Sequence, residues 1–226
     1  MMIRIALAGT LFLALTGCGG ATTASDPAGD PSGSPTGSAA APDDGRPTEV
    51  PAADGPVATR TIVTVMDTGE GLPQLCLGAV AESYPPQCGG PELRGWSWAD
   101  QQGVFEHQGD VRWGMFVVTG TFDGTAMDVT HAIPAALYDA APVDDGSGIE
   151  PPDTQQGLGG KQDPRRAEIA TDLEQRPLPG QLSVVPTEVS VVVDVVHDDG
   201  TIQDWADATY GEGVVEVISA LVTVGR

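Results

Sequence analysis

A long run without large apolar side chains is the feature that most restricts how this chain can fold. From Gly19 to Ala58 almost every residue is Gly, Ala, Ser, Thr, Pro or Asp, and Val50 and Val57 are the only larger apolar residues. Such a segment cannot bury enough apolar surface to offset the entropy lost on ordering, so we expect it to be disordered. A compact fold is therefore expected from Thr59 to Arg226, which is long enough for one sizeable core or two small ones.

The first residues have the pattern of a cleaved export signal. Arg4 precedes an apolar run from Ile5 to Leu15, as in secretory signal peptides. The run is about half the length needed to span a bilayer, so we do not expect it to form a permanent transmembrane helix. The sequence predicts that residues 1–17 are a signal peptide that is removed from the mature protein.

The end of this leader carries a more specific signal. Leu15-Thr16-Gly17-Cys18 resembles the bacterial lipobox, in which small residues precede a cysteine that is acylated and becomes the new N-terminus. The resemblance implies lipidation of Cys18, with palmitate among the acyl chains, and anchoring to the extracytoplasmic face of the cell membrane. Two or more chains would hold the protein firmly, since one alone anchors only marginally. Residues 18–58 would then be the lipidated N-terminus and a flexible linker.

The charge of the chain limits its partners. The formal net charge is −22, and Lys161 is the only lysine. Nucleic acid and anionic lipid surfaces would repel such a chain, so we expect no nucleic-acid partner. The expected partners are the membrane, through the N-terminal lipid, and a protein or glycan of the cell envelope.

Residues 59–142 have the signals of a β-rich unit. Thr61–Met66 is β-branched and alternating, which indicates a strand. Val111–Phe122 and Thr125–Thr130 flank the pair Asp123-Gly124, which is typical of a hairpin turn.

Two glycines, Gly114 and Gly120, interrupt the first strand of this hairpin. A glycine inside a strand indicates a bulge or a bend of the kind found at barrel corners. Several short strands with Gly and Pro turns then predict a small barrel or a sandwich, and an OB-like barrel is one option.

Two cysteines remain in this unit if Cys18 carries lipid. Cys76 and Cys88 would meet in an oxidising compartment, so we predict a disulfide between them. It would close a loop of about 13 residues and stabilise the fold by roughly 3 kcal/mol. A zinc site would need two further ligands, and no His or Cys has a customary spacing for it.

Two tryptophans, Trp96 and Trp98, lie two residues apart and would share one side of an extended segment. They have two interpretations: a binding surface for a sugar or peptide, or core packing beside the disulfide loop. The second is the commoner role of aromatic residues in small folds.

The stretch from Leu75 to about Val129 resembles a known group of proteins. The sequence combines Cys-Leu-Gly, Tyr-Pro-Pro-Gln-Cys-Gly-Gly-Pro, Gly-Trp-Ser-Trp, Trp-Gly and Gly-Thr-Phe-Asp-Gly. It is similar in this respect to uncharacterised lipoproteins and secreted proteins of high-GC Gram-positive (actinobacterial) bacteria. The resemblance covers roughly a third of the mature chain, and it implies no known activity.

The remaining residues predict a second, mixed unit. Residues 143–163 are polar and lack periodicity, so we expect a mobile loop. Residues 164–226 then read as helix, strand, helix, strand, and the fold class is α+β. The signals, in chain order, are an N-cap and proline at Asp163-Pro164, a β-branched run at Thr187–Val196, a capping-box spacing at Thr201 and Asp204, and a strand at Val214–Val224.

Motifs of catalysis are absent from the sequence: it contains no nucleophile elbow, phosphate-binding loop or His-Glu-x-x-His. We therefore expect a non-catalytic binding or interaction module without a cofactor or metal. The alternative is a hydrolase or metal-dependent enzyme with an unrecognised site, for which His131 and His197 with nearby acids are candidates. Asp144-Asp145 with Glu150 could hold a weak calcium ion but lacks regular spacing.

Overall fold

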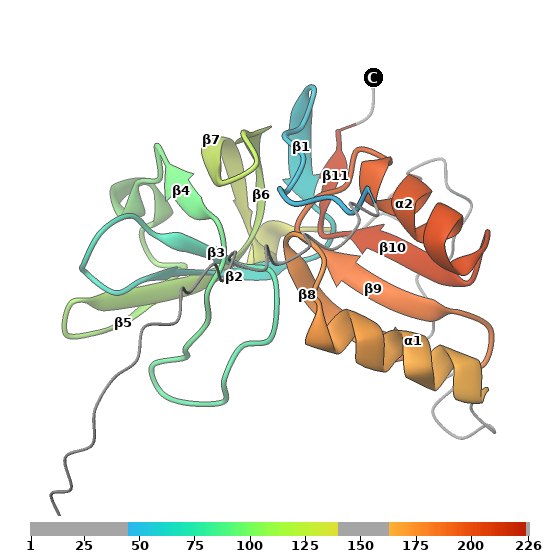
Figure 1. Cartoon of the computed structure of the whole chain (residues 1–226). Coiled ribbons are helices and arrows are strands. Elements are labelled where there is room, and N and C mark those ends of the chain that lie inside the picture. The colour runs from blue at the N-terminus through green and yellow to red at the C-terminus, as the bar shows by residue number, and fades with distance from the viewer. Residues whose placement is uncertain (1–44, 140–162, 225–226) are drawn as a thin grey trace, which may run out of the picture. The chain divides into compact units, whose positions relative to one another are not determined.

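The computed structural model describes residues 45–139 and 163–224 (Figure 1). These residues form a mixed α+β fold, as predicted, with two α-helices, two short 3-10 helices and two β-sheets. The elements in chain order are β1 (Pro56–Thr59), β2 (Val63–Asp67), β3 (Gln74–Cys76), β4 (Glu92–Arg94), η1 (Trp98–Gln101), β5 (Glu106–Gln108), β6 (Val111–Phe122), β7 (Ala126–Pro134), η2 (Ala135–Leu137), α1 (Pro164–Gln175), β8 (Gln181–Pro186), β9 (Val191–Val195), α2 (Thr201–Tyr210), β10 (Val215–Ser219) and β11 (Leu221–Thr223).

Five strands of the larger sheet form a partly closed ring in the order β2, β3, β4, β7, β6, with β6 pairing again with β2. All neighbours are antiparallel except β4 and β7, which are parallel. Counted along the chain, the third and fifth strands of the ring are the parallel pair. This is the strand order of the OB fold, a five-stranded Greek-key barrel. Of the architectures that the sequence left open, the OB-like barrel is the one with this topology.

Each strand of the ring supplies a fully buried side chain to the barrel core. The core residues are Val65 from β2, Leu75 from β3, Leu93 from β4, Phe116 and Val118 from β6, and Met127 from β7. Burial of this apolar surface is the main favourable contribution to the stability of the barrel.

The pairing of the long strand β6 is irregular at Gly120, one of the two glycines at which the sequence predicts a bend or bulge. The register with β7 shifts between Thr119 and Gly120. A Cβ atom at Gly120 would lie 2.2 Å from the carbonyl oxygen of Asp128, so the close approach of β6 and β7 requires glycine. Residues 112–116 of β6 pair with β2, and residues 119–121 pair with β1.

The last part of the segment expected to be a disordered linker is folded. Pro56–Thr59 form β1, which lies between β6 and β11. Val57 is buried in the barrel core, Val50 packs against the same core, and the N–H of Ala53 donates to the carbonyl of Phe122. The prediction of disorder is therefore wrong for residues 45–58, because two valines and backbone hydrogen bonds are enough to extend a sheet that already exists.

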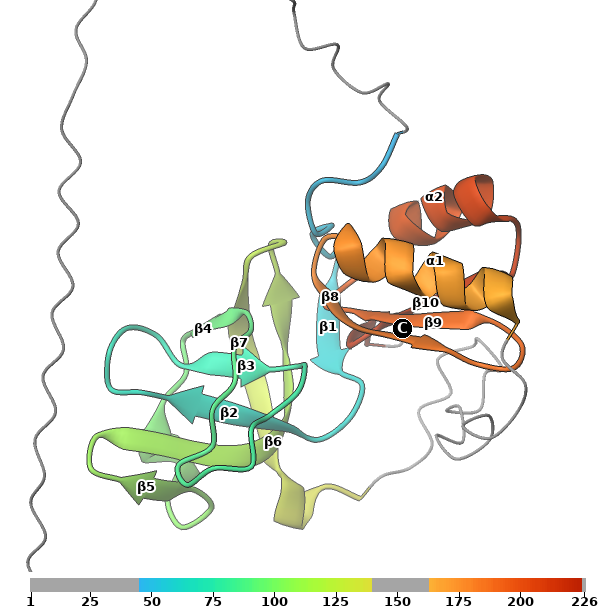
Figure 2. The same cartoon turned by 60° about the horizontal axis from the view of Figure 1, so that its bottom comes forward.

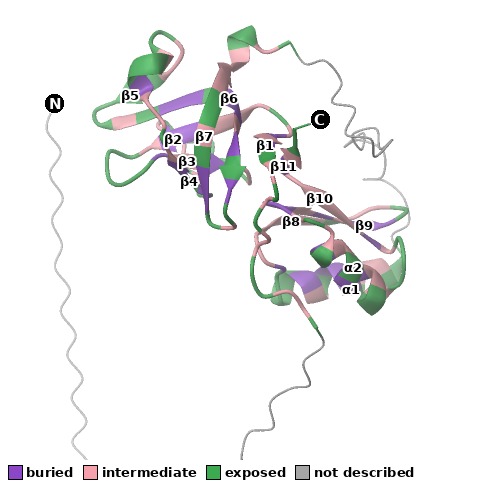
Figure 3. Ribbon diagram, turned by 90° about the horizontal axis from the view of Figure 1, so that it is seen from above, coloured by how far each residue is buried: buried purple, intermediate pink, exposed green. Residues whose placement is uncertain are grey.

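The second sheet has three strands in the order β10, β9, β8, with β9 in the centre. β9 is parallel to β10 and antiparallel to β8. Both helices cover one face of this sheet (Figure 2). Buried side chains of β9, α1 and α2 meet there, and Figure 3 shows buried stretches in these elements. They include Val191, Val193, Val195, Ile169, Leu173, Ile202 and Trp205.

Three details of this part differ from the prediction. The expected strand 187–196 begins only at Val191, because the hydroxyl and amide of Thr187 bond to Ser190 and form a turn. The strand β8 before this turn was missed. The expected strand 214–224 is interrupted at Ala220, and its two parts, β10 and β11, belong to different sheets.

Backbone hydrogen bonds at this interruption connect the two sheets. The N–H of Ala220 donates to the carbonyl of Val195 at 2.8 Å, and the N–H of Leu221 donates to that of Val196 at 3.0 Å. β11 then pairs with β1 of the larger sheet. Within the described ranges, no helix is long and apolar enough to span a membrane. The leader, Cys18 and the predicted loop 143–163, apart from Asp163, lie outside the described residues.

Candidate binding site between the barrel and the three-stranded sheet

The two cysteines of the barrel lie at disulfide distance, with their Cα atoms 5.6 Å apart. The loop between them covers the outer side of β2 and β6. The ring of Tyr84 contacts the ring of Trp113 edge to face at 5.1 Å between centroids, and the sulfur of Cys88 lies 3.8 Å from that of Met66. The disulfide loop therefore packs as a cover on the barrel wall, consistent with the structural role predicted for Cys76 and Cys88.

The tryptophan pair does not form an exposed platform. Trp98 is buried, and Trp96 is partly buried against the same core cluster. The two rings contact each other, and both contact Phe116. The indole N–H of Trp98 donates to Asp67 at 2.8 Å. Of the two interpretations, core packing describes this geometry, because little aromatic surface is left for a ligand.

The three histidines do not assemble into a site. His107 and His131 are exposed. His197 is buried, its Nδ1 lies 3.2 Å from the carbonyl oxygen of Leu221, and its ring contacts Phe122. Among the residues that the structure describes, no three His, Cys, Asp or Glu side chains could hold a metal ion together. The calcium candidates Asp144, Asp145 and Glu150 lie outside those residues.

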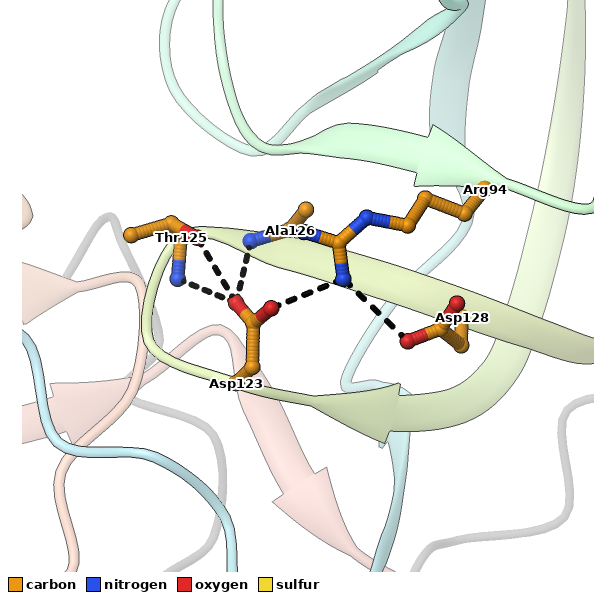
Figure 4. A network of polar contacts seen from close by, with 5 residues as sticks. All are labelled: Arg94, Asp123, Thr125, Ala126 and Asp128. Atoms are coloured by element: carbon orange, nitrogen blue, oxygen red, sulfur yellow. Dashed lines mark hydrogen bonds and ion pairs between the residues drawn. The ribbon is translucent and has the colours of Figure 1, made fainter.

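A network of charged side chains closes the β6–β7 hairpin (Figure 4). The carboxylate of Asp123 accepts hydrogen bonds from the N–H of Ala126, from the hydroxyl and N–H of Thr125, and from Arg94 at 2.7 Å. These donors, with Ala126 the largest cause, hold the pKa of Asp123 far below its ordinary value. Arg94 also reaches Asp128, so it ties β4 to both sides of the turn. The arrangement is structural, because each group is used inside the network.

The described residues contain a pocket of about 370 Å³ between the barrel and the helix-free face of the three-stranded sheet. We call it the junction pocket. The barrel lines it with the link between β1 and β2 and with the segment after β3: Arg60, Thr61, Val63, Leu77, Gly78 and Ala79. The smaller sheet lines it with β8, β9, β10 and the residue before β11: Leu182, Ser183, Asp194, Ile218, Ser219 and Ala220.

Strand alternation explains why Asp194 faces this pocket. Successive side chains of a strand point to opposite faces, and Val193 and Val195 of β9 are buried under the helices. Asp194 between them must point to the other face. Ser183 and Ile218 are its partners in the neighbouring strands, so their side chains share that face.

A register shift in β8 brings a further apolar side chain to the pocket. The pairing of β8 with β9 is irregular between Gln181 and Ser183. A bulge of this kind redirects a side chain, and here Leu182 and Ser183 both line the pocket although they are adjacent in sequence. Gly78 of the barrel lies opposite, where an added Cβ would be 3.5 Å from Leu182.

The polar groups of the pocket have defined partners. The hydroxyl of Ser183 donates to Oδ2 of Asp194 at 2.5 Å. Nε of Arg60 donates to the carbonyl oxygen of Ser219 at 2.9 Å, which fixes the link between β1 and β2 against the end of β10. The lining residues include no histidine, cysteine or lysine. Mostly apolar walls with a few oriented polar groups are typical of a ligand-binding site.

Sequence reasoning missed this site, although one signal for it is present. Asp194 interrupts the run Val191-Val192-Val193-Asp194-Val195-Val196. A single carboxylate in such a run indicates that the strand has one buried face and one face that is open to solvent or to a ligand. The barrel side of the pocket has no comparable signal, because its residues come together only through the tertiary fold.

No protein-family model matches this chain, and no curated protein or solved structure is significantly similar to it. A ligand-binding role must therefore rest on the geometry of the site.

Proposed function

We propose that this protein is an extracytoplasmic lipoprotein that is anchored to the cell membrane through Cys18 and binds a small ligand in the junction pocket. The binding part rests on one observation, the pocket itself. It combines apolar side chains from two sheets with an oriented carboxylate at Asp194, and its volume of about 370 Å³ lies in the range of small-molecule sites.

The location rests on the sequence of the N-terminus. The apolar leader, the lipobox-like Leu15-Thr16-Gly17-Cys18 and the following Gly-, Ala- and Ser-rich stretch agree with a lipidated N-terminus and a spacer. The cysteine pair Cys76 and Cys88 also suits an oxidising compartment outside the cytoplasm. Such a module would receive its ligand from a protein or glycan of the cell envelope, or would present the ligand to one.

Metabolic labelling tests the anchor. Cells that express the protein are grown with an alkyne-tagged fatty acid, and the protein is then captured from membrane and soluble fractions. We expect the wild-type protein to be labelled and to remain with the membrane, and Cys18→Ser to be unlabelled and soluble. Equal labelling of both proteins would contradict lipidation at Cys18.

Retention of a native ligand tests the binding. The wild-type protein and a pocket-filling variant, Ile218→Trp, are purified from their own cell envelope, and the bound small molecules are identified by mass spectrometry. We expect at least one molecule to be enriched with the wild type only. Identical profiles from two folded proteins would contradict a binding role for the junction pocket.

A further inference from the structure

We infer that the junction pocket selects a small amphipathic amine, whose protonated nitrogen binds Asp194 and whose apolar part contacts Leu77, Leu182 and Ile218. This inference rests on the proposed binding function and names the class of ligand.

The carboxylate of Asp194 determines which polar group the ligand must carry. Its Oδ2 accepts the hydrogen bond from Ser183, and one such bond leaves further acceptor positions on the carboxylate. An ionised carboxylate only accepts hydrogen bonds, so its complement is a donor, and a cationic donor forms the strongest bond. The Ser183 hydroxyl fixes the orientation of the carboxylate before the ligand arrives.

The apolar walls of the pocket determine the size of the apolar part of the ligand. Leu77 and Val63 lie on the barrel side, and Leu182 and Ile218 lie on the sheet side; all four are only partly buried. Covering their exposed surface would contribute to binding in proportion to the apolar area removed from water. The volume of about 370 Å³ is near the lower limit for such sites, so the ligand is small.

The charge of the protein favours a cation over an anion. With a formal net charge of −22, the chain attracts cations and repels anions at long range. Arg60 is the other charged residue of the pocket lining, and its Nε bonds to the carbonyl of Ser219. Because the guanidinium of Arg60 repels a cation and the carboxylate of Asp194 attracts one, the ammonium group is placed at Asp194 and the apolar part against the apolar walls.

Three probes of equal chain length test the inference: hexylamine, hexanol and hexanoate. Each is titrated into the mature Cys18→Ser chain, and affinity is measured from shifts of backbone signals in ¹H–¹⁵N spectra. We expect hexylamine to bind at least about ten-fold more tightly than hexanol, because it adds a charge-assisted hydrogen bond, and hexanoate to bind more weakly than hexanol.

Matched variants test whether the preference for the amine comes from Asp194. Asp194→Asn should abolish the preference for the amine, whereas Glu216→Gln should retain it, since Glu216 lies on the same sheet face but outside the pocket lining. Ile218→Trp should remove binding of all probes, and Ala79→Trp, at an exposed loop position of the lining, should do the same if Ile218→Trp does not fold.

The possible outcomes distinguish a failure of the amine inference from a failure of the proposed binding function. If the probes bind in the pocket but the amine has no advantage, or if Glu216→Gln loses the preference as Asp194→Asn does, the amine inference is overturned while the pocket remains a binding site. If the pocket-filling variants bind all probes as the wild type does, the junction pocket is not the site, and both proposals fail.

Discussion

The hydroxyl of Tyr210, at the end of α2, donates a 2.7 Å hydrogen bond to Oδ2 of Asp172 in α1, so the two helices are joined by a pair of side chains as well as by the sheet beneath them. Burial and the acceptor Asp172 raise the pKa of Tyr210 from 10.0 to about 12. A group whose pKa is raised on folding contributes stability below its unfolded pKa, and this contribution is lost as the pH rises through the folded pKa. We therefore expect the free energy of unfolding to fall between about pH 10 and about pH 12.

Replacing this tyrosine tests the relationship. Tyr210→Phe should lower the free energy of unfolding at neutral pH by about 1 kcal/mol, the usual net value of one hydrogen bond. It should also make the decrease between pH 10 and 12 shallower. Urea denaturation at stepwise pH measures both effects, with Tyr84→Phe, whose side chain is 67% exposed, as the control. A Tyr210→Phe profile parallel to that of the wild type would contradict this account.

The N-terminus of α2 supplies a second prediction. The sequence suggested a capping box between Thr201 and Asp204, but Asp198 accepts hydrogen bonds from the N–H groups of Ile202 at 2.9 Å and Gln203 at 3.2 Å. Asp198→Ala should therefore lower the free energy of unfolding by about 1 kcal/mol, as loss of a helix cap does. Asp204→Ala is the control and should cost less, because it removes only a charge near the helix dipole. The reverse ranking would show that the capping box operates.

The close approach of β6 and β7 at Gly120 gives a third prediction. Gly120→Ala should destabilise the protein by at least about 2 kcal/mol, because the new Cβ would meet the carbonyl oxygen of Asp128 and the backbone would have to move. Gly55→Ala is the matched control, since a Cβ there meets nothing within 4 Å. Thermal unfolding followed by circular dichroism measures both. Equal melting temperatures for the two variants would mean that β6 and β7 do not approach as described.

The disulfide loop gives a fourth prediction. Loss of the Cys76–Cys88 link should lower the free energy of unfolding by about 3 kcal/mol, from the entropy of a loop of this length. Dithiothreitol should lower the melting temperature of the wild type and leave a Cys76→Ser/Cys88→Ser chain unchanged. An unchanged wild type, with both thiols open to alkylation before reduction, would show that the cysteines are not linked.

Local patterns were sufficient to predict both α-helices, the β6–β7 hairpin and the strands β2 and β9. The Asp-Gly turn between β6 and β7, the irregular pairing at Gly120 and the start of α1 at Asp163-Pro164 all depend on residues close together in sequence. The short strands β3, β4, β5 and β8 were missed, and so was β1, which depends on distant partners. Residues 56–59 look like linker, and they form β1 only because β6 and β11 offer backbone groups on both sides.

The junction pocket was not predicted for the same reason. Arg60, Leu77 and Ile218 are far apart in sequence, and their side chains meet only where Ala220 carries the chain from one sheet to the other. Asp194 alone carried a local signal, as a carboxylate within a run of valines. Trp96 and Trp98 have a local signal as a pair of aromatic residues, but Trp98 belongs to the core and Trp96 packs against it.

The most direct test of a binding role for the junction pocket is a ¹H–¹⁵N spectrum of the mature Cys18→Ser chain, recorded before and after an extract of its own cell envelope is added. The account predicts that backbone signals of the pocket lining shift, including those of Leu77, Leu182, Asp194 and Ile218, while signals of the solvent side of α1 and α2 stay in place. Shifts confined to other surfaces, or no shift with either the aqueous or the organic fraction of the extract, would contradict it.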